Sequence, residues 1–269
     1  MDQIRVGSDR FILAPKYYTN LDELELKLKS FSYRVRKDEC LDLPDKIRTQ
    51  RLIDLTPDQK RTYGELKERA LAIINDDTVS YNNKLTELLR LHQVTCGFVK
   101  DDNGSVHEFD KCPKMEELLN ITEESEGKII IWANYVYNIE KIMKTLEKHY
   151  GKNSTVAIYG AVNTANRQEA VKRFQEDPEC RFFVGNPSTG GFGLTLTAAS
   201  YMVYFSNNFN LEVRQQSEDR AHRIGQKRNV TYIDIIAQKT VDQYILKTLQ
   251  NKVKLSAETL GETVKAWLC

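Results

Sequence analysis

The sequence predicts an α/β fold in which a parallel β-sheet with flanking helices follows a mostly helical N-terminal segment. Five short apolar runs occur after Gly127, namely KIIIW, TVAIY, CRFFVG, YMVYF and VTYIDII, and stretches of helical length separate them. Apolar strands that alternate with helical stretches are typical of a parallel sheet covered by crossover helices. Little strand pattern precedes roughly residue 120. We therefore divide the chain into a mostly helical segment with a short β-hairpin, 1–125, and a sheet domain, 126–269.

The N-terminal segment is expected to contain helices and one hairpin. In TPDQ, Thr56 suits an N-cap and Gln59 the matching position of a capping box, which opens a helix through roughly residue 74. A second helix places four side chains on one stripe: Leu85, Leu88, Leu89 and His92. The run FVKDDNGSVHEF surrounds Asn103 and Gly104, a pair that favours a tight hairpin turn. A Glu- and Leu-rich helix follows over about 114–124.

Four stretches between or after the apolar runs are long enough to be helices that cross from one strand to the next. They cover about 135–150, 166–177, 212–223 and 240–256. Asn166 with Glu169, and Thr240 with Gln243, have the spacing of capping pairs. Crossovers between parallel strands are nearly always right-handed, so these helices are expected to connect the strands with that hand.

The composition describes a globular chain without a strong electrostatic signature. The 269 residues are 41% apolar, enough for a sizeable core, and the formal net charge is +1. No general basic field therefore marks a nucleic-acid binder, and any anion site must be local. Five scattered cysteines suit a reducing compartment, so we expect an intracellular protein, cytoplasmic or nuclear. No stretch resembles a signal peptide or a membrane span, and no membrane partner is expected.

The segment QQSEDRAHRIGQ, residues 215–226, carries a possible anion site. On a helix, Gln216, Arg220 and Arg223 would lie on one face because residues three and four apart stack. Such a convergence of polar and cationic side chains favours an anionic ligand. The alternative is a solvated helix face, with Asp219 and Arg223 forming an ordinary surface ion pair.

Two loops that follow predicted strands offer further ligand-binding groups. In an open parallel sheet, ligands collect beyond the carboxyl ends of the strands. After CRFFVG, hydroxyl groups are followed by glycines that let the backbone approach an anion: Ser188, Thr189, Gly190, Gly191 and Gly193. After TVAIY, Gly160 and Asn163 hold the corresponding position. Taken alone, such a glycine-containing loop is better explained as a turn.

The order of these parts resembles the C-terminal RecA-like lobe of Swi/Snf-type ATPases in helicase superfamily 2. KIIIWANY resembles motif IV, STGGFGLTLTAA resembles motif V, and QSEDRAHR resembles motif VI. The AHRIGQ ending is typical of the Swi/Snf branch. The resemblance is dense over about 127–250, and the C-terminal TVDQYILKTLQNKVKLSAETLG resembles the helix that closes the family's second lobe. The N-terminal segment resembles the passage from the first lobe into a helical protrusion.

The resemblance implies a role in ATP hydrolysis. In such enzymes ATP lies between two lobes, and arginines of the second lobe stabilise the transferred phosphoryl group. Arg220 and Arg223 match these arginine fingers, whose loss can cost ~10³-fold in rate in related systems, and Gln216 matches the polar contact beside them. Guanidinium suits this role because it stays charged and forks onto phosphate oxygens. Gly191 and Gly193 are candidates for the nucleotide side.

The resemblance also implies contact with double-stranded DNA. Ser188, Thr189, Gly160 and Asn163 are candidates for gripping the phosphate backbone, since hydroxyls and backbone amides position a strand without reading bases. The expected function is therefore the second lobe of an ATP-dependent DNA translocase. The alternative is an adaptor module with the same fold that binds nucleic acid or protein without motor activity.

Two parts of a complete ATPase are missing from the sequence. A P-loop reads GxxxxGK[ST], whereas YGKNS at 150–154 lacks the leading glycine and the adjacent hydroxyl. LDELEL at 21–26 contains Asp22 and Glu23, but no buried strand precedes this pair to make it a magnesium site. We therefore expect ATP and Mg²⁺ to bind mainly through a first lobe that this chain lacks, and the chain alone to be inactive.

Four residues could in principle form a His/Cys zinc site: His92, Cys96, His107 and Cys112. Their spacing matches zinc modules poorly, because only His92 and Cys96 form a helical pair four residues apart. His92 also belongs to the apolar stripe of its helix. No metal ligand set is therefore expected.

Overall fold

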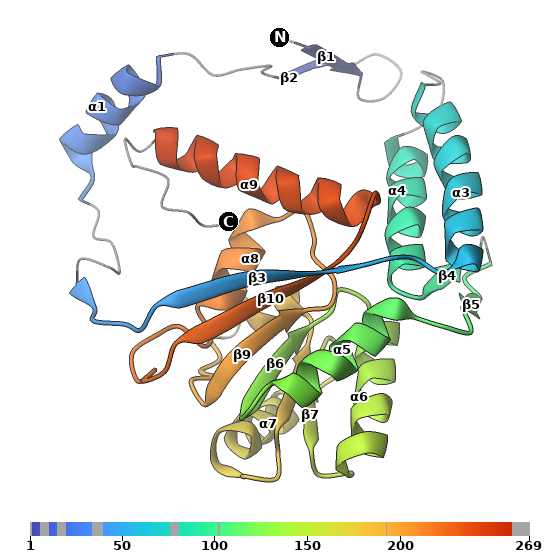
Figure 1. The fold of residues 1–269 in the computed structure, drawn as a ribbon. Coiled ribbons are helices and arrows are strands. Elements are labelled where there is room, and N and C mark those ends of the chain that lie inside the picture. The colour runs from blue at the N-terminus through green and yellow to red at the C-terminus, as the bar shows by residue number, and fades with distance from the viewer. Residues whose placement is uncertain are drawn as a thin grey trace.

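A computed structural model describes residues 2–5, 11–14, 20–33, 40–75, 81–101, 103–191 and 193–259. Its centre is a six-stranded parallel sheet with the order β3-β10-β9-β6-β8-β7 (Figure 1). The strands are β3 (Lys46–Ile53), β6 (Lys128–Trp132), β7 (Thr155–Ile158), β8 (Phe182–Gly185), β9 (Ala199–Tyr204) and β10 (Val230–Ala237). The five strands predicted from apolar runs are all confirmed, as is the α/β fold class.

The edge strand β3 was not predicted, because it lies in the segment that shows little strand pattern. It pairs in parallel with β10 over all eight residues, from Lys46 beside Val230 to Ile53 beside Ala237. Its sequence, KIRTQRLI, is polar at most positions, and only Ile53 is buried. An edge strand is paired on one side only, so it does not need the continuous apolar run of a central strand. The division at residue 125 stays a prediction, although β3 precedes it and belongs to the sheet.

The other N-terminal elements largely follow the predictions. Helices α3 (Pro57–Asn75), α4 (Tyr81–Thr95) and α5 (Pro113–Glu124) confirm the three expected helices. Strands β4 (Phe98–Lys100) and β5 (Val106–Glu108) form the expected hairpin around Asn103 and Gly104. Two further elements lie at the periphery in Figure 1, a hairpin of β1 (Asp2–Arg5) and β2 (Phe11–Ala14), and α1 (Leu21–Phe31). Asp22 and Glu23 lie in the first turn of α1.

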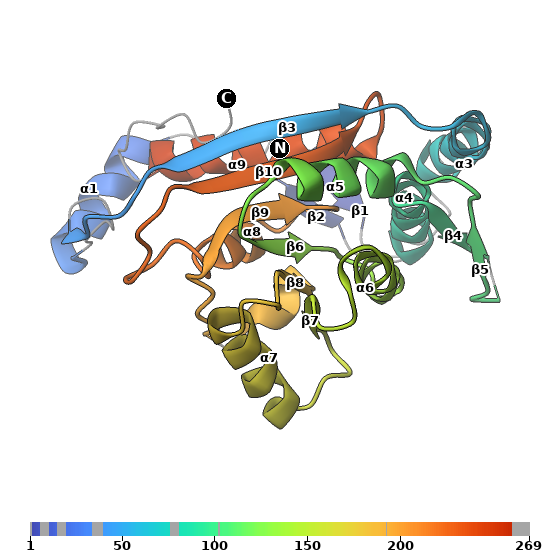
Figure 2. The same cartoon turned by 60° about the horizontal axis from the view of Figure 1, so that its bottom comes forward.

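Helices cover both faces of the sheet, as Figure 2 shows with α5 and α6 (Val136–Tyr150) on one side and α7 (Thr164–Glu176) on the other. Alternate residues of β6 belong to different core clusters. Ile129 and Ile131 pack with α5 and α6, whereas Ile130 and Trp132 pack toward α7. Strands apolar on both faces therefore build two cores, which explains their continuous hydrophobic runs.

A third cluster joins helices at the carboxyl end of the sheet. Ala70 of α3 and Leu91 of α4 pack against Val241, Ile245 and Leu249 of α9 (Val241–Thr259). Helix α9 begins beside α4 and runs along the sheet toward α1 in Figure 1. It includes most of the stretch expected to close the lobe, and residues 260–269, Cys269 included, lie outside the described part.

The cysteines of the described chain bear on the expected reducing compartment. Cys40, Cys96, Cys112 and Cys180 are free cysteines. Burial raises the pKa of the Cys96 thiol to about 12, so this side chain stays protonated and packs as a small apolar group.

Among the described helices, none combines the length and the apolar character needed to cross a bilayer.

Candidate functional site

Polar residues that follow three neighbouring strands form the base of the candidate site. The Asn134 N–H, after β6, donates to the Ser206 hydroxyl, after β9, at 2.9 Å. The side-chain amide of Asn186, after β8, donates to the Asn134 carbonyl at 2.8 Å. The Asn186 side-chain oxygen accepts from the Ser188 N–H at 2.8 Å. These bonds fix the start of the loop that carries the glycines relative to the sheet.

The four candidate DNA-binding residues lie in loops that leave adjacent strands, since β7 pairs with β8. Ser188 is exposed and Thr189 half-buried in the short 3₁₀ helix η1 (Pro187–Gly191). Gly160 is exposed, and a Cβ there would meet open space, so no packing contact requires glycine. Asn163 is also exposed, and its side-chain oxygen accepts from the Asn166 N–H at 2.9 Å.

This bond makes Asn163 the N-cap of α7 and corrects the predicted capping pair of Asn166 with Glu169. The helix begins at Thr164, two residues earlier than the sequence indicated. Asn at the N-cap satisfies a backbone N–H that the first turn leaves unpaired. Asn163 and Asn166 both suit an N-cap by residue type, and the structure uses the earlier one.

Two separate cavities flank the loop that begins at η1. One, of ≈ 270 Å³, is lined by Asn134, Asn186 and Ser188 together with apolar side chains of α4 and α9. The other, of ≈ 650 Å³, lies between α7 and the segment Gly193 to Thr195. Ser188 and Gly193 therefore lie on the same loop but line different cavities, whereas Gly160 and Asn163 lie in the loop after β7.

The second part of this loop lies beside the arginine-containing segment. Gly193 has a φ of 59°, a left-handed conformation that glycine adopts readily. One guanidinium nitrogen of Arg223 donates to the Thr195 hydroxyl at 3.1 Å and approaches the Gly193 carbonyl at 3.5 Å. The Leu196 N–H donates to the Arg220 carbonyl at 2.8 Å. The structure thus brings the glycine-containing segment and the two arginines together, as the sequence order suggested. Gly191 ends η1, two residues before Gly193.

The predicted helical stripe of Gln216, Arg220 and Arg223 is wrong in one respect. Helix α8 (Leu211–Glu218) ends before both arginines, with Asp219 as its C-cap. The chain then turns so that Ala221 packs in the core and the Arg220 carbonyl bonds to Leu196. The two arginines are therefore held by irregular turns rather than by helical spacing.

Gln216 remains on α8 and is exposed. Its side-chain amide donates to a carboxylate oxygen of Glu212 at 2.9 Å, one turn earlier in the same helix. Gln216 thus bonds within its own helix rather than to either arginine.

Arg220 is half-buried and carries an unused donor. Its Nε is buried without a hydrogen-bond partner among the described residues. Burial lowers the pKa of Arg220, the nearby Arg223 lowers it further, and Asp219 opposes both effects. A guanidinium remains charged even so, and two neighbouring cations with an unsatisfied donor favour an incoming anion.

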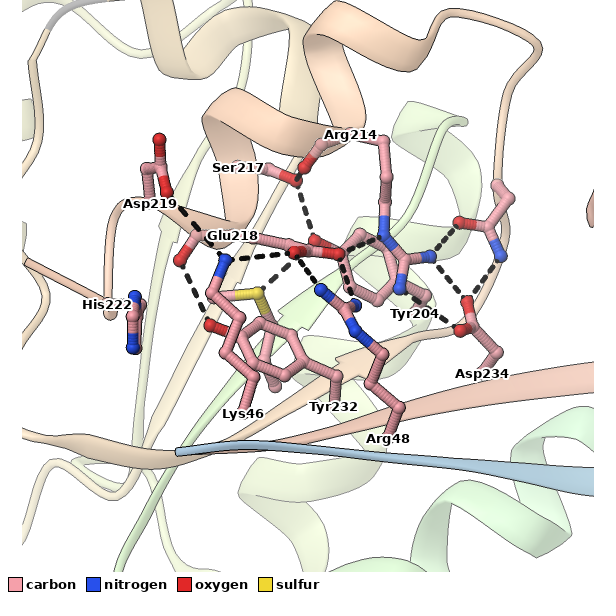
Figure 3. Close-up of polar contacts among 12 residues, drawn as sticks. Lys46, Arg48, Tyr204, Arg214, Ser217, Glu218, Asp219, His222, Tyr232 and Asp234 are labelled. Carbon is pink, nitrogen blue, oxygen red and sulfur yellow. Dashed lines mark hydrogen bonds and ion pairs between the residues drawn. The ribbon is translucent and has the colours of Figure 1, made fainter. Parts of the chain in front are cut away.

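A buried ionic network centres on Glu218, two residues before Arg220 in the sequence (Figure 3). This network was not predicted. Glu218 is fully buried and accepts from both terminal nitrogens of Arg48, at 2.8 and 2.7 Å. It also accepts from Arg214 Nε at 3.0 Å, and Lys46 Nζ lies 3.4 Å away. Arg214 in turn forks onto Asp234 at 2.6 and 3.0 Å. Two carboxylates and three cations thus connect α8 with β3 and β10.

The cations of this network favour the ionised form of Glu218. Burial alone would raise the pKa of Glu218, but Arg48, Arg214 and Lys46 lower it to about 2. Arg214 also lies over the Tyr204 ring, 3.4 Å from its centroid. Two sequence signals point to the network, namely Arg214 and Glu218 four residues apart and Asp234 inside an apolar strand. The link to β3 has no local signal.

The four His and Cys residues of the possible zinc site lie in different settings. His92 is buried in α4, with Nε2 3.6 Å from a carboxylate oxygen of Asp242, whereas His107 is exposed on β5 and pairs with Asp101 at 3.0 Å. Cys96 and Cys112 are buried. Within the described ranges, no group of three or more His, Cys, Asp or Glu residues could hold a metal ion.

Comparison with known proteins places this geometry in a family. Residues 110–225 match the model of the helicase conserved C-terminal domain, a range that includes both arginines. An uncharacterized ATP-dependent helicase of Mycoplasma genitalium is 29% identical over 250 residues, covering 91% of this chain and 24% of that protein. A SWI/SNF-related matrix-associated actin-dependent regulator of chromatin subfamily A-like protein 1 homolog of Caenorhabditis elegans is 29% identical, covering 96% of this chain and 37% of that protein.

A solved structure supports the same assignment. The SWI2/SNF2 ATPase core of Sulfolobus solfataricus, in complex with double-stranded DNA, has a TM-score of 0.64 and 28% identity and covers 90% of this chain and 52% of that one. The chain therefore carries a helicase C-terminal domain with the RecA-like fold. More particularly, it is a C-terminal lobe of the Swi/Snf type in helicase superfamily 2. It spans about a quarter of the length of the first curated relatives, 24% and 23%.

Proposed function

We propose that this lobe works as the second half of an ATP-dependent motor that moves along double-stranded DNA. The observation that carries the proposal is the position of Arg220 and Arg223 beside the segment Gly193 to Thr195, with Arg220 Nε buried and unpaired among the described residues. An anion with strong acceptor oxygens satisfies that donor, and a triphosphate supplies them.

In this proposal the two arginines stabilise negative charge on the phosphoryl group during its transfer to water. Charged donors held in place before the reaction lower the barrier because they need no reorganisation in the transition state. Gln216 is the proposed polar contact beside them, which requires its amide to leave Glu212. The backbone of Gly191 and Gly193 is the proposed surface on the nucleotide side. A first lobe with a P-loop would hold most of ATP and Mg²⁺.

The DNA contact is proposed for the cavity of ≈ 270 Å³ that Ser188 lines, and for the loop that follows β7. Ser188 is exposed there, Thr189 follows it, and Gly160 and Asn163 lie in the loop after the adjacent strand. Hydroxyls and backbone amides contact phosphates without reading bases, so binding would be independent of sequence. Support comes from the Sulfolobus relative, whose core was solved with double-stranded DNA. An intracellular location follows from this proposal.

The first prediction tests the arginines in the complete protein that joins this lobe to a P-loop lobe. Arg223→Ala and Arg220→Ala should each lower DNA-stimulated ATP turnover by about two orders of magnitude or more. Arg228→Ala removes the same charge from an exposed position five residues beyond Arg223 and serves as the control. Phosphate release measured with and without duplex DNA gives the rates.

Folding and activity can be separated in the same series. Because Arg223 bonds to the neutral Thr195 hydroxyl and Gly193 carbonyl, and Arg220 Nε has no partner among the described residues, each change should alter the free energy of unfolding by about 1 kcal/mol or less. This lobe alone should hydrolyse no ATP. Full turnover after replacement of both arginines, or DNA-stimulated turnover by the lobe alone, would overturn the proposal.

A further inference from the structure

We propose that Arg48 is a positioning residue for Arg220, and that residues 44–48 hold the turn that carries this arginine from both sides. The inference rests on the proposed function, because it gives Arg220 a task that depends on its position. Its basis is a set of contacts between the edge strand β3 and the segment 218–222, which are far apart in the sequence.

The first contact fixes the chain two residues before Arg220. Arg48 binds both carboxylate oxygens of Glu218 through a fork of 2.8 and 2.7 Å, and Lys46 Nζ lies 3.4 Å from the same carboxylate. A bidentate pair sets direction as well as distance, because two parallel bonds prevent rotation of the carboxylate. Glu218 is the last residue of α8, so the pair defines where the turn begins.

The second contact fixes the chain two residues after Arg220. His222 is buried, and its Nε2 donates to the Pro44 carbonyl at 2.8 Å. Between the two contacts, the Arg220 carbonyl accepts from the Leu196 N–H at 2.8 Å. The Arg220 backbone is therefore held at three points, two of which depend on the segment that enters β3.

β3 is a firm support for these contacts. All eight of its residues are in register with β10, and Tyr232 of β10 lies beneath the Arg48 guanidinium at 5.0 Å from the ring centroid. The Tyr232 hydroxyl also donates to the Glu218 carbonyl at 3.3 Å. β3 and β10 together form a rigid base, which holds α8 and the Arg220 turn in one arrangement.

Loss of Arg48 should loosen the turn without removing the ionic network. Glu218 would keep Arg214 as a buried partner and Lys46 as a half-buried one. The carboxylate could then rotate, and Arg220 would reach the transferred phosphoryl group in a smaller fraction of encounters. Small misplacements of catalytic groups have large effects on rate, so we expect turnover to fall by about tenfold. Nucleotide binding through the first lobe should not change.

The test compares Arg48→Met with Arg51→Met in the complete two-lobed protein. Arg51 lies on the same strand and pairs with Glu117 and Glu124 of α5, so its removal deletes the same charge and an ion pair away from Arg220. Arg48→Met should lower kcat about tenfold with KM for ATP unchanged, whereas Arg51→Met should keep both. Arg48→Lys, which cannot fork, should restore little of the lost rate.

A double-mutant cycle separates positioning from general destabilisation. In an Arg220→Ala background, Arg48→Met should lower turnover no further, because the group it positions is already gone. A further fall of about tenfold in that background, or an unchanged kcat in Arg48→Met alone, would overturn the inference. If Arg220→Ala itself leaves turnover intact, the proposed function fails instead, so the two failures are distinguishable.

Discussion

At the scale of single residues, the buried His92 makes stability depend on pH. Burial lowers its pKa to about 4, the attraction of Asp242 opposes this shift, and Lys114 adds to it. In the unfolded chain an ordinary histidine has a pKa of about 6.5. Because only the unfolded state takes up the proton between these values, His92 contributes stability above about pH 6.5 that is lost as pH falls toward 4.

The corresponding prediction compares unfolding at two pH values. Between about pH 7 and about pH 5, the free energy of unfolding should fall by about 2 kcal/mol on account of His92. His92→Gln, which keeps an acceptor for the Tyr135 hydroxyl, should remove most of that fall. Urea titrations followed by circular dichroism measure it, with the exposed His107→Gln as a control. Equal losses in the original protein and His92→Gln would contradict the assignment.

The sequence could predict the candidate arginines but not what holds them. Arg220 and Arg223 stand in one short segment, and the resemblance of that segment to motif VI, together with the order of the neighbouring motifs, suggested a shared ligand. Arg48 and Glu218 are separated by 170 residues, and nothing in either local sequence indicates the other. Similarly, Arg223 contacts Thr195 of the glycine-containing loop because the order of the strands brings these two segments together. Long-range pairing needs the three-dimensional fold.

At the scale of elements, local signals worked where one residue decides a boundary. The Gln59 N–H donates to the Thr56 hydroxyl at 3.2 Å, and the Thr56 N–H donates to the Gln59 side-chain oxygen at 3.1 Å. This is the reciprocal capping box that TPDQ predicted. Gln59 is fully buried, and its amide also donates to the Val94 carbonyl at 2.8 Å, which joins α3 to α4.

We expect Thr56→Ala to destabilise the protein by about 1 kcal/mol, since an N-cap hydroxyl and its reciprocal bond are lost. Thr62→Ala, in the interior of the same helix, is the matched control and should have a smaller effect or none. Chemical denaturation of both variants measures the difference. A loss in Thr56→Ala no larger than in Thr62→Ala would show that the cap does not stabilise α3.

Elements without local signals were the ones predicted poorly. The central strands are apolar on both faces and were found from their composition, whereas β3 is a polar edge strand and was not. Helix α8 was drawn five residues too long because QQSEDRAHR contains no glycine or proline before Gly225 to mark its end. Its end depends on tertiary contacts of Glu218 and Ala221 rather than on helix propensity.

At the scale of the whole molecule, charge is balanced but its distribution is not uniform. The net charge is +1, and several cations are already neutralised inside the fold. Arg214 and Lys114 are both buried, where they pair with Asp234 and Asp242. The cations left to contact a nucleic acid are therefore fewer than the composition suggests, and the proposed grip on DNA relies mainly on hydroxyls and backbone amides.

The last prediction follows from this charge balance and concerns DNA binding by the lobe itself. With only a few phosphate contacts, we expect binding to duplexes of mixed sequence with a dissociation constant of ~10⁻⁴ to 10⁻⁶ M near physiological salt. Affinity should fall between about 50 and about 200 mM salt with a log–log slope of about −2 to −4, since each phosphate neutralised by one of the few remaining Lys or Arg side chains contributes roughly −0.9. Fluorescence anisotropy with several unrelated duplexes measures both quantities.

The contrary outcomes discriminate between the two functions that the sequence allowed. A motor must step past every base pair, so the affinity should be equal for all duplexes, because its contacts reach phosphates and not base edges. Tight binding that persists at high salt, or a clear preference for one sequence, requires contacts of another kind. Either result would favour an adaptor that kept this fold to recognise a fixed site, and Arg220 and Arg223 would then need a different explanation.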